Sequence, residues 1–286
     1  MTRAISRRTF LATATIVSLQ GKRGFAQEST SNSERVGSMM TQADKLANAT
    51  VRMVLANGRG EGSGFHFIKP EIIVSNAHVM TQLISGQSAM TAHAETGESW
   101  ALKVLAYSPP DKFDFAIMEA SGAGVSSRVA LSPSTNKIIG RGLKLLYSGY
   151  PHGIDPLLVN SSEVASPMKD NTFVFSGMVH GGNSGGPVVS NDDLSALGIV
   201  TKRRFFGDPE MRAVDAEMKE LQDYLGQISA RGKVEIMGVN FGQFALAMSR
   251  IASLTNEIIR VNSTTGIGIA NSISPLVEKC KELKLL

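Results

Sequence analysis

The sequence lacks the features that several large classes of protein need. It has one cysteine, Cys280, so no disulfide can form within the chain. It has no internal repeat, no glycine-rich phosphate loop, and no histidine or cysteine spacing that is typical of a metal site. We therefore expect no metal ion and no cofactor, and a fold that is stabilised by the packing of its core alone.

The chain has no excess of basic charge after residue 26. The sequence has 29 Lys and Arg residues and 25 Asp and Glu residues, a formal net charge of +4. Residues 1–26 hold five of the basic residues and no acidic one: Arg3, Arg7, Arg8, Lys22 and Arg23. Without this segment, 24 basic residues remain against 25 acidic ones, a net charge of −1. No basic cluster remains, so the composition argues against nucleic-acid binding.

Residues 1–26 have the pattern of a signal peptide. A basic start is followed by apolar residues from Leu11 to Leu19 and by the small-residue cleavage site Gly24-Phe25-Ala26. Within it, Ser6-Arg7-Arg8-Thr9-Phe10-Leu11 resembles the twin-arginine export motif. An ordinary secretory signal or an uncleaved anchor is the alternative, although the apolar stretch is too short to span a bilayer as a mature helix.

This signal predicts a location and a first partner. A protein exported by the twin-arginine machinery folds in the reducing cytoplasm, which agrees with a chain that has only one cysteine. We expect a bacterial protein that works in the periplasm or outside the cell. After the signal, residues 27–47 are predicted to be a polar linker and a short helix, and residues 48–286 a single domain.

The most informative motif is a serine that lies among glycines, Gly181-Gly182-Asn183-Ser184-Gly185-Gly186-Pro187. A nucleophilic serine needs an exposed hydroxyl on a tight turn and backbone N–H groups directed at a developing oxyanion. Gly182 and Gly185 suit such a turn, because glycine adopts positive-φ and crowded backbone geometry with little strain. A plain Gly-Ser loop is the alternative.

The order of residues along the chain restricts the general base. All histidines precede Ser184, and they are His66, His78, His93, His152 and His180. This order excludes an α/β-hydrolase elbow, in which the histidine follows the serine. It fits the order base, acid, nucleophile.

His78 and Asp114 are the best candidates for base and acid. His78 ends Ile72-Ile73-Val74-Ser75-Asn76-Ala77-His78, an apolar run with strand character, and a strand end is a rigid mounting for a catalytic base. Asp114 precedes the apolar run Phe115-Ala116-Ile117-Met118. A carboxylate there needs a partner, and the imidazole N–H would supply one. Taken singly, each residue could be an ordinary core, surface or turn residue.

The segments "SNAHV", "DFAIM" and "GNSGGP" together resemble the signatures of trypsin-like serine proteases of the HtrA/Deg branch. Two further segments agree: Ser148-Gly149-Tyr150-Pro151-His152-Gly153 and Thr265-Gly266-Ile267-Gly268-Ile269-Ala270. The resemblance implies a mainly β fold of two packed six-stranded antiparallel barrels, chymotrypsin-like, with the active site between them. It implies His78 as general base, Asp114 as its orienting acid, Ser184 as nucleophile, and an oxyanion hole formed by the N–H groups of Gly182 and Ser184.

The chain departs from this family at two places. Residues 202–262 form an insertion of about sixty residues, with a helix predicted after Asp208-Pro209 and a second amphipathic segment from Phe244 to Ile259. A helical hairpin that caps the second barrel, a lid, a substrate-gripping arm and an oligomer contact all remain open. A C-terminal helix is predicted from Ser274. We expect no PDZ domain of the kind that typical HtrA proteins carry.

The sequence thus predicts a serine endopeptidase that hydrolyses protein or peptide substrates through an acyl-enzyme. A non-catalytic peptide-binding or chaperone-like protein on the same fold is the alternative. Met178 and His180, just before the nucleophile loop, are predicted to line the substrate pocket, because this segment forms the pocket floor in trypsin-like folds. Met178 stands where a carboxylate would favour Arg or Lys, so we expect cleavage after small or medium apolar residues.

Overall fold

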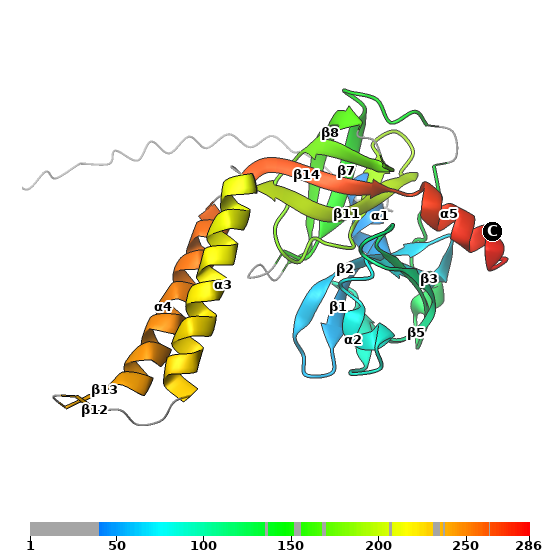
Figure 1. Cartoon of the computed structure of the whole chain (residues 1–286). Coiled ribbons are helices and arrows are strands. Elements are labelled where there is room, and N and C mark those ends of the chain that lie inside the picture. The colour runs from blue at the N-terminus through cyan, green and yellow to red at the C-terminus, as the bar shows by residue number, and fades with distance from the viewer. Residues whose placement is uncertain are drawn as a thin grey trace, which may run out of the picture. The chain divides into compact units, whose positions relative to one another are not determined.

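Two closed antiparallel barrels of six strands each form the body of this computed structural model (Figure 1). The structure describes residues 40–134, 137–151, 156–167, 170–205, 208–230, 235–236, 238–262 and 264–286. The predicted signal peptide, the linker up to residue 39 and His152 lie outside these ranges. The predicted fold class, mainly β with two six-stranded barrels, a helical insertion and a C-terminal helix, is confirmed.

The first barrel has the strand order β1-β2-β3-β6-β5-β4. Its strands are β1 Thr50–Leu55, β2 Gly60–Phe67, β3 Lys69–Ser75, β4 Met90–His93, β5 Ser99–Ser108 and β6 Phe115–Ser121. Alternate residues of a strand point to the same face, so Val51, Met53 and Leu55 of β1 enter the barrel core. They pack there with Trp100 and Met118. The short helices α2 Thr81–Ile84 and η1 Val125–Ser127 follow β3 and β6 in the chain.

The second barrel has the strand order β10-β11-β14-β9-β8-β7. Its strands are β7 Lys144–Gly149, β8 Leu158–Pro167, β9 Thr172–Ser176, β10 Pro187–Ser190, β11 Ala196–Phe205 and β14 Thr264–Ser272. Its interior contains Tyr147, Phe173 and Phe175, whose rings pack at tilted angles. Each barrel therefore has its own apolar core and supplies a rigid support for the loops between its strands.

A third apolar cluster joins the barrels to the two terminal helices, α1 Gln42–Ala49 and α5 Ser274–Glu282. Phe65 of the first barrel and Ile199 of the second both belong to it, with Leu46 from α1 and Cys280 from α5. Burial raises the pKa of the Cys280 thiol to about 11. The only cysteine is therefore a packing residue with an unreactive thiol.

The insertion between β11 and β14 is a helical hairpin. Helix α3, Asp208–Ala230, and helix α4, Phe241–Asn262, lie side by side (Figure 1) and are linked through the short strands β12 Glu235–Ile236 and β13 Val239–Asn240. Because β11 and β14 pair with each other, the hairpin continues an antiparallel strand pair of the second barrel. Within the described residues, no helix is both long and apolar enough to cross a membrane.

His66 is a buried histidine of β2 that has a structural role. Its ring packs edge-to-face on Trp100, and its Nδ1–H donates to the carbonyl oxygen of Pro70. Its Nε2 is buried and has no hydrogen-bond partner among the described residues, so none of them would accept a second ring proton there. Desolvation is the largest cause that lowers the pKa of His66 to about 4.

His66 should make the free energy of unfolding depend on pH. The unfolded chain protonates this side chain near its ordinary pKa of about 6.5, whereas the folded protein resists protonation until about pH 4. The stability that neutral His66 contributes is therefore complete above about pH 6.5 and is lost as the pH falls. The loss between pH 7 and pH 5 should be about 2 kcal/mol, measurable by urea titration at both pH values.

The control for this prediction is His66→Asn, which keeps a donor near the position of Nδ1 but cannot titrate. The variant should be less stable at pH 7, yet should lose less stability on acidification. An unchanged pH dependence would contradict the assignment to His66.

Candidate active site

His78 lies in the turn that follows β3, where it is hydrogen-bonded to Asp114. Its backbone N–H donates to Asp114 Oδ1 at 3.1 Å, and its ring Nδ1 lies 2.7 Å from Asp114 Oδ2. An ionised carboxylate only accepts hydrogen bonds, so Nδ1 carries the ring proton and Nε2 keeps its lone pair. The imidazole is 39% exposed. This geometry leaves Nε2 free to accept a proton from a neighbouring group.

Asp114 precedes β6 and is almost completely buried. Its backbone is in the left-handed region, with φ of 49°, which Asp tolerates better than most residues. Besides the two bonds from His78, its Oδ2 accepts one from the Thr201 hydroxyl at 3.0 Å. The Asn76 amide group donates to the Asp114 carbonyl oxygen at 2.8 Å. The carboxylate is thus satisfied by three donors, as a buried charge requires.

Ser184 lies in a turn whose glycines are needed for its shape. Gly182 has φ of 97° and Gly185 has φ of 87°, both in the left-handed region. A side chain at Gly185 would collide with the Ser63 carbonyl oxygen and the Ser75 hydroxyl. The sequence pattern predicted positive-φ geometry at Gly182 and Gly185, and the backbone has it at both positions.

The loop of the second barrel is fixed by strand β2 of the first barrel. The Ser63 N–H donates to the Ser184 carbonyl oxygen at 2.8 Å, and the Ser63 hydroxyl donates to the Gly182 carbonyl oxygen at 2.7 Å. On the other side, the Gly185 N–H donates to the Val200 carbonyl oxygen at 2.8 Å. The loop's position is therefore set by hydrogen bonds with residues of both barrels.

The backbone N–H groups of Gly182 and Ser184 are the candidates for an oxyanion hole. The Asn183 N–H donates to the His180 carbonyl oxygen at 3.1 Å, which closes a turn with positive φ at Gly182, as in a type II turn. Among the described residues, no oxygen accepts from the N–H of Gly182 or of Ser184. Paired free N–H groups beside a serine hydroxyl can stabilise an oxyanion.

The Ser184 hydroxyl points toward Thr201. Its Oγ donates to the Thr201 carbonyl oxygen at 3.4 Å, beyond the usual 2.5–3.0 Å of O–H···O bonds. Within the described part of the chain, no hydrogen bond joins Ser184 Oγ to the ring of His78. The structure therefore brings His78 and Asp114 into contact, and it leaves the serine on its loop with a weak bond elsewhere.

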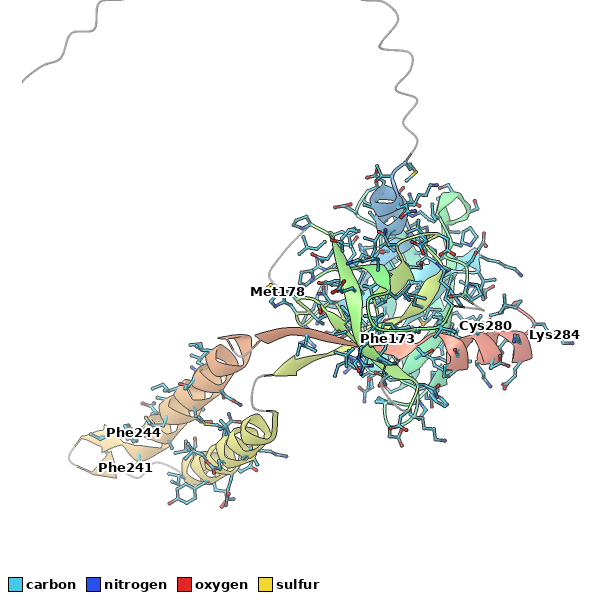
Figure 2. The ribbon with its side chains drawn as sticks, turned by 90° about the horizontal axis from the view of Figure 1, so that it is seen from above. Phe173, Met178, Phe241, Phe244, Cys280 and Lys284 are labelled. Atoms are coloured by element: carbon cyan, nitrogen blue, oxygen red, sulfur yellow. The ribbon has the colours of Figure 1, made fainter. Side chains whose placement is uncertain are left out.

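Met178 and His180 lie on the segment that leads into the loop. Met178, labelled in Figure 2, has a side chain that is 62% exposed. Its carbonyl oxygen accepts a hydrogen bond from the Tyr147 hydroxyl at 3.2 Å. His180 is half-buried and uses its carbonyl oxygen in the turn that contains Gly182. The contribution of Met178 and His180 to a substrate pocket stays a prediction.

Sequence reasoning missed Thr201, Asn76 and Ser63. A usable signal existed for Thr201, which is a polar residue directly after the apolar strand residues Leu197–Val200. Asn76 stands inside the same motif as His78. Among the described residues, no group of three His, Cys, Asp or Glu side chains is arranged to hold a metal ion.

Comparisons with known proteins identify the same region. A family model described as trypsin-like peptidase domain matches residues 62–199, which include His78, Asp114 and Ser184. The chain is similar to the crystal structure of the serine endoprotease from Yersinia pestis, with 18% identity, a TM-score of 0.48, and coverage of 57% of this chain and 58% of that chain. It thus spans less than two thirds of that structure.

The chain is also similar to the crystal structure of Deg5, with 20% identity and a TM-score of 0.45. This similarity covers 55% of this chain and 81% of that chain. No curated protein matches the sequence.

Replacement of Gly185 should destabilise the protein more than replacement of a glycine that has a similar φ but no close neighbours. Gly185→Ala combines left-handed strain with the two collisions, and should lower the free energy of unfolding by about 3 kcal/mol or more. Gly58 has φ of 83° with no neighbouring atom in reach, so Gly58→Ala should cost only about 1 kcal/mol. Urea denaturation of both variants measures the difference. Equal losses would show that the contacts of the loop are looser than described.

Proposed function

We propose that this protein is a serine endopeptidase that uses His78, Asp114 and Ser184 as a catalytic triad. The observation that carries the proposal is the 2.7 Å bond between His78 Nδ1 and Asp114 Oδ2, together with a serine loop in which the Gly182 and Ser184 N–H groups have no acceptor among the described residues. The bond fixes the tautomer in which Nε2 is the base. The match of the trypsin-like peptidase model to residues 62–199 supports the same chemistry.

The first half of the reaction forms the acyl-enzyme. The Ser184 hydroxyl rotates from the Thr201 carbonyl oxygen toward His78. This rotation breaks only one long hydrogen bond, of 3.4 Å. His78 Nε2 takes the hydroxyl proton as Oγ bonds to the peptide carbonyl carbon. The developing oxyanion accepts hydrogen bonds from the N–H groups of Gly182 and Ser184. The imidazolium, stabilised by Asp114, then gives its proton to the leaving amine as the C–N bond breaks.

The second half releases the product. Water gives a proton to His78 Nε2 as its oxygen attacks the acyl carbon, and the same N–H groups stabilise the second oxyanion. The Ser184 oxygen leaves and takes the proton back. Thr201 assists throughout, because its hydroxyl and His78 together hold the Asp114 carboxylate.

Ser184→Ala should abolish peptide hydrolysis and labelling by a fluorophosphonate probe. We expect hydrolysis to fall at least about 1000-fold, because the attacking oxygen is absent. The melting temperature should hardly change, since the hydroxyl makes only one long hydrogen bond. Ser161→Ala, at an exposed serine, is the control and should keep full labelling.

Failure of the wild-type folded protein to label would favour the non-catalytic peptide-binding alternative. Where cleavage occurs, a peptide library should show small or medium apolar residues before the scissile bond. Cleavage mainly after Arg or Lys would contradict the role proposed for Met178.

We propose further that the twin-arginine machinery exports the protein to the periplasm or the medium. The paired Arg7 and Arg8, followed by Phe10-Leu11, support this route. Replacement of both arginines by lysine should leave unprocessed precursor in the cytoplasm, as detected by fractionation and immunoblotting. Normal export of that double variant would indicate the general secretory route instead.

A further inference from the structure

Ser63 is a buried polar residue of strand β2 that takes no part in the reaction steps proposed above. The residue is completely buried, and its hydroxyl bonds to two segments that are far away in the sequence. The hydroxyl donates to the Gly182 carbonyl oxygen at 2.7 Å and accepts from the Tyr150 N–H at 2.9 Å. One side chain therefore connects β2, the serine loop and the residue that follows β7.

The Gly182 carbonyl oxygen belongs to the peptide group that lies between the two candidate oxyanion donors. The Gly182 N–H is part of the peptide group before it, and the Ser184 N–H is part of the one after it. The N–H of this middle group, that of Asn183, donates to the His180 carbonyl oxygen, and its oxygen accepts from Ser63. Because a peptide group is planar, these two bonds fix its direction. That direction sets how the two donors are placed relative to each other.

Gly182 cannot hold this peptide group in place by itself. Glycine adopts positive and negative φ with about equal ease, so the residue does not enforce its own φ of 97°. Strand β2 comes very close to the loop, since a Cβ at Gly62 would lie 2.9 Å from the Ser184 carbonyl oxygen. The loop takes its conformation from these contacts with β2, and the bond from the Ser63 hydroxyl is one that a single substitution removes.

We propose that Ser63 is a positioning residue for the oxyanion hole. Its hydroxyl holds the peptide group between Gly182 and Asn183 so that the N–H groups of Gly182 and Ser184 reach the same oxygen. This inference rests on the proposed endopeptidase function, because the oxyanion forms only in that reaction. Loss of the hydroxyl should destabilise the charged transition state more than the bound substrate, whose carbonyl group is neutral.

Ser63→Ala tests the proposal, because it removes the hydroxyl and keeps the N–H that bonds to the Ser184 carbonyl oxygen. We expect kcat for a peptide substrate to fall about 10- to 100-fold, the effect of a small displacement of catalytic groups. KM should stay within about threefold. Affinity for a peptide boronic acid, whose tetrahedral adduct places an oxygen in the oxyanion hole, should fall in proportion to kcat/KM. Steady-state kinetics and inhibitor titration measure these quantities.

Thr50→Val is the matched control. Thr50 is also completely buried, and its hydroxyl donates to the Leu46 carbonyl oxygen and lies 2.7 Å from Ser148 Oγ of the second barrel. None of these residues belongs to the serine loop. In urea denaturation the control should lose stability as Ser63→Ala does, since each change deletes a buried hydroxyl. Its kcat should stay within about twofold of the wild-type value.

Ser63→Cys decides the question where Ser63→Ala does not fold, because a thiol occupies the same place but is a weak donor. Its kcat should also fall while KM stays nearly constant. A wild-type kcat in the folded Ser63 variant would overturn the inference, as would a loss confined to KM or an equal loss of kcat in Thr50→Val. A wild-type protein that hydrolyses no peptide would instead overturn the proposed function itself, and this inference with it.

Discussion

The buried carboxylate of Asp114 is the constraint on which the candidate site depends. A charge taken out of water must be paired and hydrogen-bonded, and Asp114 receives donors from both barrels. His78 follows strand β3 of the first barrel, whereas Thr201 belongs to β11 of the second. The need to satisfy one carboxylate therefore sets the imidazole tautomer, its ring orientation, and the distance between the two barrels at the site.

The serine loop meets a second constraint of the same kind. Ser63 of the first barrel takes up two carbonyl groups of the loop, those of Gly182 and Ser184, through its N–H and its hydroxyl. Among the described residues, the N–H groups of Gly182 and Ser184 have no acceptor. The loop cannot accept a Cβ at Gly185, because it would collide with the Ser63 carbonyl oxygen and the Ser75 hydroxyl.

Much of this arrangement could be predicted from the sequence, because its causes are local. The glycines around Ser184, the strand that ends before His78 and the aspartate that precedes β6 each leave a pattern within a few residues. The apolar spacing after Asp208-Pro209 predicts helix α3 in the same way. The sequence marks Thr201 only as a polar residue at the end of an apolar strand. Its partner could not be assigned, since Thr201 lies 87 residues after Asp114 and the two meet only in the folded protein.

Two other features depend on information that a sequence pattern does not contain. The direction of the Ser184 hydroxyl is a side-chain rotation, and it responds to the nearest acceptor, here the Thr201 carbonyl oxygen. The exposure of Met178 depends on the segments that surround it, so its residue type alone does not define a pocket. The large apolar residues of α4 predicted an amphipathic helix. The face of α4 that packs inside the hairpin is instead the one that carries its small residues.

A crystal structure of the protein after reaction with a fluorophosphonate tests the central claim most directly. The account predicts phosphorus bonded to Ser184 Oγ, with a phosphoryl oxygen that accepts hydrogen bonds from the N–H groups of Gly182 and Ser184. The His78–Asp114 bond should persist, with His78 Nε2 directed toward the phosphonylated oxygen. An unmodified Ser184, or a phosphoryl oxygen turned away from both N–H groups, would contradict it.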